Sequence, residues 1–402
     1  MNVKVLRKID KYLIWFLVLL FFWIKYLFVW NKKKLIKKPK KILVIRMWAL
    51  WSSLLTFPMI KQLRDHYWEL VQYDLLASTR NIWVFKNQWY FKNMFNLFSL
   101  KDLLKLIISF KKYDIVIDTE EYFRISAFMS MRLGKINVWF NNIPLRWLAY
   151  NAWIKYNDEQ HSVLTCLDLI KAIWINYKIP AWLEPLRYTD KNTKQVDEFL
   201  NWLEYSKIIC MHTGLAETVK ERAWPKNKRV ELIQKVIDKD RKAKIVLSGT
   251  RWEYDSVQNT IVSLPKKYHN NVINICWIFN LFWFAYLLEK CDVMVSNDTG
   301  PMHLAAAMWT KTIGLFWPNL PMRFWPYPLD KNISLYKWNG KAYINVHLWK
   351  FEEDIDFNIE KIEIEDVLET IEFYFFLFIM LWNILLLEEC DLYILISCIG
   401  FW

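Results

Sequence analysis

The stretch Ser296-Asn-Asp-Thr-Gly-Pro-Met-His-Leu-Ala-Ala-Ala307 lies between two short apolar segments, Cys291-Asp-Val-Met-Val295 and Ile313-Gly-Leu-Phe316. Both segments are typical of buried strands, so the stretch is predicted to turn from a strand into a helix. Backbone N–H groups at such a turn bind anions, and the Asp298 carboxylate could accept hydroxyl protons. His303 stands about one helical turn later. A nucleotide diphosphate would suit these groups. The alternative is an ordinary capped helix with His303 packed in the core.

From Lys41 onward, short apolar segments alternate with helical stretches, which predicts an α/β fold with parallel sheets and crossover helices. Strands are expected over Ile42–Ile45, Leu70–Leu75, Ile115–Ile117, Ile208–Met211, Lys244–Leu247, Val293–Val295 and Thr312–Phe316. Helices are expected over Leu54–His66, Leu100–Phe110, Ser162–Ile175, Lys194–Leu203, Val230–Asp238, Phe279–Lys290 and Pro301–Met308. The alternation occurs in two halves with a boundary near Tyr205, which indicates two domains.

Four segments in order resemble glycosyltransferase family 9, the lipopolysaccharide heptosyltransferases. The stretch 296–307 with Leu315-Phe-Trp-Pro318 is similar to the family pattern N-D-T-G-P-x-H-x-A-A-A followed by L-F-G-P. Three earlier segments also match, Lys41–Pro58, Tyr113–Ala127 and His212–Pro225. The resemblance covers about residues 41 to 374 and implies a GT-B fold, with two Rossmann-like domains facing a cleft. Its parts are an acceptor domain (42–204), a nucleotide-sugar domain (205–345) and a closing helical segment (346–374).

The resemblance implies inverting transfer of a heptose-like sugar from a nucleotide diphosphate donor of the ADP-heptose type. The acceptor would be lipopolysaccharide or another lipid-linked or envelope glycan, and no cofactor or metal ion is implied. Glu253 matches the family's ribose-binding glutamate, and Arg222 stands where the family has a phosphate-contacting lysine. The other implied donor-site residues are Thr213, Gly214, Lys220, Asp298, Thr299, Gly300 and His303. The alternatives are a non-catalytic nucleotide-sugar or glycan-binding relative, and a transferase for a different nucleotide sugar.

The family's proposed general base is an aspartate in the turn after the first strand, and this chain has Ser52 in that position. A neutral serine is a poor base. Asp118, Glu120 and Glu121 follow another strand of the same domain, at the edge that faces the same cleft. We therefore expect Glu120 or Glu121 to supply the carboxylate. The alternative is that these residues only form an acidic helix start.

Tryptophan occurs where the family has glycine. The chain contains 25 Trp and only 7 Gly, and six tryptophans fall on family glycines, several in tight turns: Trp48, Trp51, Trp277, Trp309, Trp317 and Trp325. Only glycine tolerates positive φ without strain or lets backbone approach a phosphate closely. We hypothesise that the source reads UGA as glycine, whereas this sequence was translated with UGA as tryptophan. Trp224 matches a family tryptophan and is expected to remain. The alternative is a Trp-rich protein that contacts membrane interfaces.

Positive charge is concentrated at the N-terminus. Residues 1–41 contain 12 Lys and Arg and one Asp, whereas the remaining chain is nearly balanced. The main body therefore shows no basic excess that would indicate nucleic-acid binding. The six cysteines have no C-x-x-C spacing, which favours free thiols in a reducing compartment over disulfides or a zinc site.

Two apolar segments indicate membrane contact. Tyr12–Trp30 is 19 residues long with one charge, Lys25, and just reaches the length of a transmembrane helix. Its basic flanks favour the cytoplasmic side of the inner membrane for the catalytic body. An interfacial helix is the main alternative. The tail 375–402 begins with the apolar run Phe375–Leu387 and is expected either to contact the membrane or to cover an apolar surface of the body.

Overall fold

A computed structural model describes residues 38–48, 50–67, 71–121, 123–142, 146–212, 222–317, 319, 321–337 and 359–386. These residues form two compact units. Unit 1 contains the chain up to Thr189 together with Met322–Pro328, and unit 2 contains Asp190–Pro321 and the chain from Leu329 onward. Nearly all of the expected anchor 1–41, the first part of the segment 346–374 (residues 346–358) and the last residues of the tail lie outside the described ranges.

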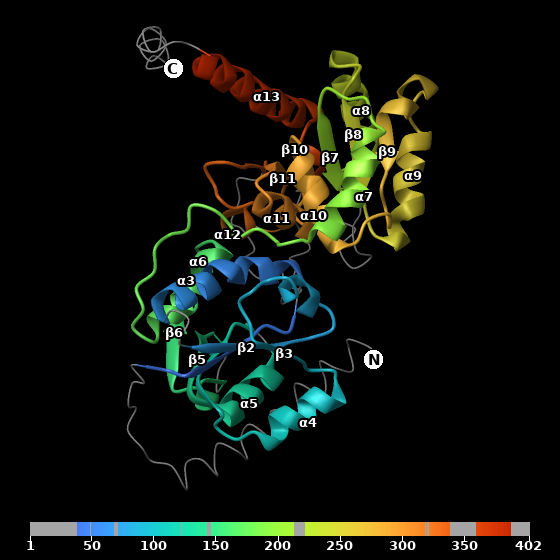
Figure 1. The fold of residues 1–402 in the computed structure, drawn as a ribbon. Helices are drawn as coiled ribbons and strands as arrows, with labels where there is room; N and C mark the ends of the chain where they lie inside the picture. Colours follow the sequence, from blue (N-terminus) through green and yellow to red (C-terminus); the bar gives the residue numbers. More distant parts are fainter. Residues whose placement is uncertain are drawn as a thin grey trace, which may run out of the picture. The chain divides into compact units, whose positions relative to one another are not determined.

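Unit 1 is built on a parallel sheet in the order β3-β2-β1-β4-β5-β6 (Figure 1). Its strands are β1 (Lys41–Ile45), β2 (Gln72–Ala77), β3 (Asn93–Asn96), β4 (Tyr113–Asp118), β5 (Gly134–Asn141) and β6 (Ala152–Lys155). The central strand β1 pairs with β2 on one side and β4 on the other, and its residues from Ile42 to Ile45 are fully buried. Burial on both faces explains its continuous apolar sequence. The strand order is that of a Rossmann sheet.

The helices of unit 1 largely agree with the expected ones. They are α3 (Phe57–Tyr67), α4 (Leu100–Ile108), α5 (Arg124–Leu133) and α6 (Ser162–Lys171). The expected helix over Leu54–His66 is divided, because Trp51–Thr56 forms a 3-10 helix before α3 begins. Strands β3, β5 and β6 were not predicted. β3 and β6 have only four residues each, and the apolar residues of β5 are interrupted by Lys135 and Asn137.

Unit 2 repeats the architecture with the order β12-β11-β10-β7-β8-β9, again with parallel pairs (Figure 1). Its strands are β7 (Ile208–His212), β8 (Lys244–Ser248), β9 (Val272–Asn274), β10 (Val293–Asn297), β11 (Lys311–Leu315) and β12 (Ile333–Leu335). Its helices include α7 (Asp190–Asn201), α8 (Lys226–Lys239), α9 (Tyr254–Val262), α10 (Leu281–Lys290), α11 (Gly300–Ala307) and α13 (Ile364–Leu386). The two halves of the chain therefore share one topology.

The division between the units lies at Thr189, not near Tyr205 as the sequence suggested. Helix α7 belongs to unit 2, where Asp197 accepts a hydrogen bond from the Tyr286 hydroxyl on α10 at 2.7 Å. The chain later returns to unit 1 through Met322–Pro328. There the carbonyl of Trp325 accepts a hydrogen bond from His161 Nε2 at 2.9 Å. These long-range contacts set the boundary.

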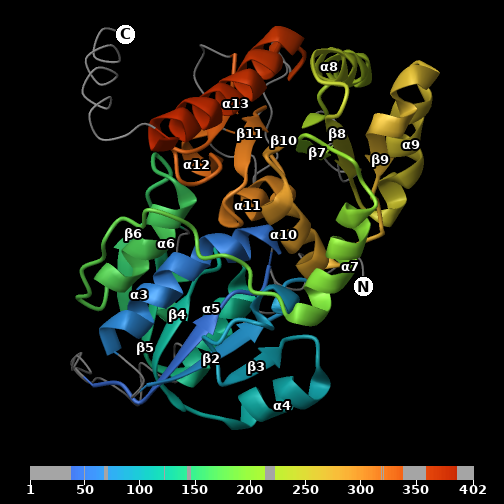
Figure 2. The same cartoon turned by 45° about the horizontal axis from the view of Figure 1, so that its top comes forward.

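Helix α13 continues from the closing helical segment 346–374 into the apolar run that begins at Phe375, so the end of that segment and the start of the tail form one helix. It packs on unit 2 through Val367 and Ile371, which are buried, and lies beside α8 (Figure 2). Lysines of α8 and acidic residues in or just before α13 form ion pairs, Lys228–Glu363, Lys235–Glu365 and Lys239–Glu372. Of the helices in the described ranges, none has the length and apolar character needed to cross a bilayer.

Three tryptophans have a left-handed backbone conformation. The φ angles are 64° at Trp174, 69° at Trp277 and 67° at Trp309, and the other non-glycine residue of this kind in the described ranges is Lys111 at 50°. An L-residue with a Cβ atom rarely adopts this region. Trp277 and Trp309 are two of the six positions where the sequence suggested native glycine, and Trp174 was not among them.

Candidate functional site

The strand orders locate a candidate site in each unit. In an open parallel sheet, ligands bind beyond the carboxyl ends of the strands, where the strand order reverses. This switch point lies between β1 and β4 in unit 1 and between β7 and β10 in unit 2. The residues selected from the sequence lie on segments that follow the strands of these sheets, so each site can be built from its own loops.

In unit 1, Glu120 holds the turn that follows β1. Its Oε1 accepts hydrogen bonds from the backbone N–H groups of Met47 at 2.6 Å and Trp48 at 2.9 Å. The Arg46 guanidinium donates to the carbonyl of Thr119 at 2.9 Å, which ties the same two loops together. Burial raises the pKa of the Glu120 carboxyl, and the nearby Arg46 charge opposes this shift. Glu120 is therefore buried, and one of its carboxylate oxygens is already occupied by two backbone hydrogen bonds.

Asn81, which the sequence did not single out, holds the same turn from the other side. Its Nδ2 donates to the carbonyl of Arg46 at 2.7 Å and to the Ser53 hydroxyl at 3.0 Å. Asn81 follows β2, which pairs with β1, and it therefore lies at the same edge of the sheet as the turn. This position was the signal by which the sequence could have identified it. The turn after β1 is thus fixed from both flanking strands.

Asp118 belongs to a buried network. It accepts hydrogen bonds from the Tyr150 hydroxyl at 2.5 Å and from Arg146 Nη2 at 3.1 Å. The same Nη2 contacts the Ser126 hydroxyl at 2.6 Å, and the guanidinium lies 4.0 Å from the centre of the Trp139 ring. Burial raises the pKa of Asp118, and the Arg146 charge opposes it. Both partners of the ion pair are fully buried, which favours a structural role.

Glu121 differs from its two acidic neighbours because it remains partly exposed, as does Ser52. The carbonyl of Glu121 accepts a long hydrogen bond from Asn142 Nδ2 at 3.4 Å. Ser52 lies in the 3-10 helix after β1. Of the three acidic residues that follow or end β4, Glu121 is the one that is not buried.

In unit 2, Asp298 brings together three loops. It follows β10, and its Oδ2 lies 3.5 Å from Nη1 of Arg222, which precedes α8. Asn319, which follows β11, donates to the same carboxylate oxygen. Arg222 can offer further N–H donors to an anion while its contact with Asp298 orients it. Asn319 was not predicted, although it directly follows the segment Leu315–Pro318.

His303, in the helix that follows Asp298, has a ring nitrogen that can still form a hydrogen bond. It lies in α11, which begins after Asp298 with Thr299 as its N-cap and Pro301 in the first turn. Its Nδ1 is buried and has no hydrogen-bond partner within the described part of the chain. Burial lowers the pKa of His303 to about 4, so the ring is neutral at neutral pH. A buried atom of this kind fits a ligand hydrogen bond.

Glu253 forms a capping box at the helix start after β8. Its Oε2 accepts hydrogen bonds from the backbone N–H and the hydroxyl of Thr250, both at 2.6 Å. Glu253 therefore caps a helix start, and its other carboxylate oxygen can still accept a hydrogen bond from a ribose hydroxyl. Nearby, His212 at the end of β7 contacts the Ser248 hydroxyl at 3.1 Å through Nδ1. The other implied donor residues, Thr213, Gly214 and Lys220, fall outside the described ranges.

Comparison with known proteins identifies the family. A profile of glycosyltransferase family 9 (heptosyltransferase) matches residues 104–347. This range is more than half of the chain and includes Asp118–Glu121 and the whole β10–α11 turn. The chain belongs to glycosyltransferase family 9. The resemblance inferred from the four motifs is confirmed, and the protein is a glycosyltransferase.

This chain aligns with individual family 9 relatives over nearly the full length of those proteins. Lipopolysaccharide heptosyltransferase 1 of Campylobacter coli is 26% identical over 350 residues, which are 83% of this chain and 98% of that protein. The solved family 9 glycosyltransferase of Veillonella parvula DSM 2008 has a TM-score of 0.68 at 17% identity, covering 83% of this chain and 97% of the other. The Escherichia coli ADP-heptose lipopolysaccharide heptosyltransferase II has a TM-score of 0.66 at 17% identity, covering 83% and 98%. These structures support the α/β fold with two parallel sheets.

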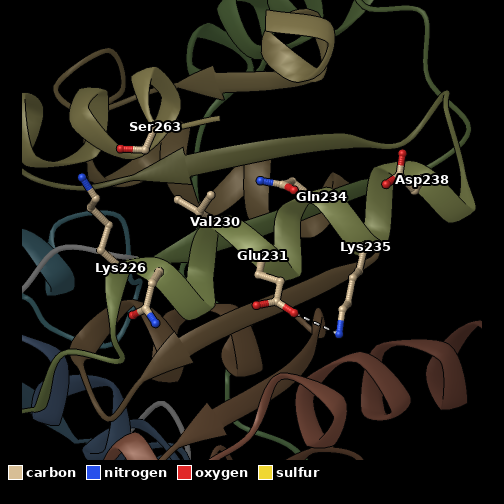
Figure 3. Close-up of a pocket in the computed structure, with 8 residues that line it drawn as sticks. Lys226, Val230, Glu231, Gln234, Lys235, Asp238 and Ser263 are labelled. Atoms are coloured by element: carbon tan, nitrogen blue, oxygen red, sulfur yellow. Dashed lines mark ion pairs between the residues drawn. The ribbon is translucent and has the colours of Figure 1, made fainter. Parts of the chain in front are cut away.

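A separate groove of this family 9 protein lies along α8 (Figure 3). It is lined by Lys226, Asn227, Val230, Glu231, Gln234, Lys235, Asp238 and Ser263. Glu231 and Lys235 form an ion pair at 3.2 Å, and Lys235 also pairs with Glu365 of α13. None of the candidate donor residues within the described ranges lines this groove, so we assign it no part in the site.

Proposed function

We propose that this family 9 glycosyltransferase transfers a heptose-like sugar from an ADP-heptose-type donor to lipopolysaccharide or a related envelope glycan. The Campylobacter coli relative is lipopolysaccharide heptosyltransferase 1, and the Escherichia coli relative is an ADP-heptose lipopolysaccharide heptosyltransferase. The proposal includes the GT-B arrangement that the resemblance implies, with unit 1 as the acceptor domain and unit 2 as the donor domain.

The observation that carries the proposal is the contact between Arg222 and Asp298 at the switch point of unit 2, directly before α11, the helix that contains His303. When the acceptor hydroxyl attacks the anomeric carbon, the bond between that carbon and the diphosphate oxygen breaks. The departing diphosphate gains negative charge, which the Arg222 guanidinium can stabilise. The neutral His303 ring can hydrogen-bond the donor without adding charge, because burial lowers its pKa to about 4.

We propose Glu121 as the general base and Glu120 as a positioning residue. Glu121 is partly exposed, and its carboxylate can take the acceptor hydroxyl proton as the new glycosidic bond forms. Glu120 instead fixes the turn that contains Met47 and Trp48. Ser52, in the position of the family aspartate, serves at most as a hydrogen-bonding group.

Turnover against a panel of nucleotide sugars tests the proposal. Release of ADP from ADP-heptose in the presence of a lipopolysaccharide-core acceptor, and its absence with other donors, is the expected result. Preference for another nucleotide sugar would support the related-transferase alternative. Tight donor binding with no release of nucleotide diphosphate under any condition would support a non-catalytic binding protein.

Attachment to the cytoplasmic face of the inner membrane through residues 1–41 completes the proposal. The support is the apolar stretch Tyr12–Trp30 between basic flanks. A chain that begins at Lys41 should move from the membrane to the soluble fraction, unless the apolar tail 375–402 retains it. Membrane association that persists after removal of both ends would exclude these segments as the principal anchor.

A further inference from the structure

Helix α4 of unit 1 has an exposed apolar surface. We define the α4 patch as the exposed side chains on and beside this helix, namely Phe98, Leu100, Leu104, Ile107, Ile108 and Phe110. Leu100 and Ile108 are 71% and 79% exposed, whereas Leu106 on the inner side is fully buried. A surface helix normally directs one apolar stripe to the core and polar residues outward. In α4 the apolar stripe continues from the buried Leu106 onto exposed side chains such as Leu104 and Ile107, and the helix lies at the outside of unit 1 (Figure 1).

The charges around the α4 patch are mainly positive. Lys101, Lys105 and Lys112 are exposed within or beside it. Arg132 of α5 donates to the carbonyl of Ile107, and its guanidinium lies 5.4 Å from the Phe110 ring. The acidic residue of the helix, Asp102, is directed to the N-terminal turn, where it accepts a hydrogen bond from the backbone N–H of Asn96 at 3.0 Å. The patch therefore presents apolar side chains framed by cations.

The α4 patch ends next to the point where the N-terminal segment joins unit 1. The chain passes from α4 through Phe110 and Lys112 into β4, whose Asp114 accepts hydrogen bonds from the backbone N–H groups of Lys40 at 2.7 Å and Lys41 at 3.1 Å. Residues 1–41, with their apolar and basic sequence, therefore lead into the same end of the sheet as the patch.

We propose that the α4 patch docks onto an anionic bilayer surface. Its apolar side chains insert at the boundary between headgroups and acyl chains, and its lysines contact the lipid phosphates. A second protein copy is a poorer fit, because lysine is depleted in protein–protein interfaces. The inference rests on the proposed function in one respect, since docking would bring the acceptor domain to a lipid-embedded glycan.

Hydrogen–deuterium exchange on the full chain tests the docking directly. Anionic vesicles containing phosphatidylglycerol should slow exchange in residues 98–112, and vesicles of phosphatidylcholine alone should have less effect. The double variant Leu104→Glu/Ile108→Glu should lose this protection. Val262→Glu, at a residue of α9 in unit 2 that is 66% exposed, is the matched control and should retain it.

Two results would overturn the docking model. One is unchanged exchange in residues 98–112 when the full chain co-sediments with anionic vesicles. The other is protection that is already present without vesicles and disappears in the double variant, because the chain itself or a second copy would then cover the patch.

Activity measurements separate docking from the proposed function. Transfer to a vesicle-embedded acceptor should fall about tenfold in the double variant, because two inserted side chains become anionic. Transfer to a deacylated, water-soluble acceptor should be unchanged, and equal losses on both acceptors would contradict docking. If the wild-type chain transfers heptose to neither acceptor, the proposed function fails while the exchange experiment still decides the docking.

Discussion

Replacement of Trp277 and Trp309 by glycine should stabilise unit 2. Their φ angles of 69° and 67° lie in the left-handed region, where a residue with a Cβ atom is less stable than glycine by about 1–2 kcal/mol. The side chains are 65% and 57% exposed, so their removal loses little packing. The greater unfolded-state entropy of glycine offsets about 0.5–1 kcal/mol. The expected net gain is about 0.5–1 kcal/mol for each replacement.

Urea unfolding of the full chain measures these differences, and two other tryptophans serve as controls. Trp252 is 92% exposed and has no left-handed backbone, so Trp252→Gly should destabilise the protein by about 0.5–1 kcal/mol. Trp224 is buried, and its Nε1 donates to the carbonyl of Ile362 at 2.9 Å. Trp224→Gly should therefore cost at least about 3–5 kcal/mol, the usual loss for a truncated core aromatic side chain.

Destabilisation by Trp277→Gly and Trp309→Gly equal to that by Trp252→Gly would refute the strain argument. Peptide mass spectrometry of protein from the native source tests the recoding hypothesis separately. Glycine is expected at Trp48 and Trp51 as well as at the two strained positions, and tryptophan is expected at Trp224. Tryptophan found at Trp48 and Trp51 would disprove recoding.

Four further predictions concern the two switch points. Glu120→Ala should lower the unfolding free energy by about 3–5 kcal/mol in urea titrations, because two backbone donors lose a charged acceptor; a change below about 1 kcal/mol would contradict its positioning role. Glu121→Gln should reduce turnover by about 10²–10⁴-fold without changing donor affinity, and undiminished turnover would exclude it as the base. Asp298→Ala should weaken ADP binding by about 1–3 kcal/mol in calorimetry, and unchanged affinity would remove it from the donor site. Burial lowers the pKa of His303 to about 4, below the ordinary value of 6.5, so its contribution to stability is present above about pH 6.5 and lost as the pH falls toward 4. The stability of the wild type relative to His303→Gln should thus fall by about 3 kcal/mol between pH 8 and pH 4, and a constant difference would show that the ring is not buried in its neutral form.

The sequence alone determined the fold class and the main elements of both sheets. Strands β1 and β10 are buried on both faces and contain uninterrupted apolar runs, Ile42–Ile45 and Val293–Val295, which can be recognised from the sequence alone. The β10–α11 turn could also be predicted from the sequence, because the strand, Asp298, Thr299 and His303 lie within a few residues of one another. Short strands such as β9 and β12, with three residues each, carry too little pattern to be recognised.

The tertiary structure decided which of the candidate side chains are available for chemistry. Glu120 and Glu121 are adjacent in sequence, yet Glu120 binds a turn 73 residues earlier, whereas Glu121 stays partly exposed. The partners of Asp298 likewise come from separate loops, since Asn319 lies 21 residues later and Arg222 lies 76 residues earlier. Strand pairing creates these neighbours, and burial then determines which charges must be compensated. Local sequence patterns specify the elements, but distance and solvent exposure arise only when those elements pack together.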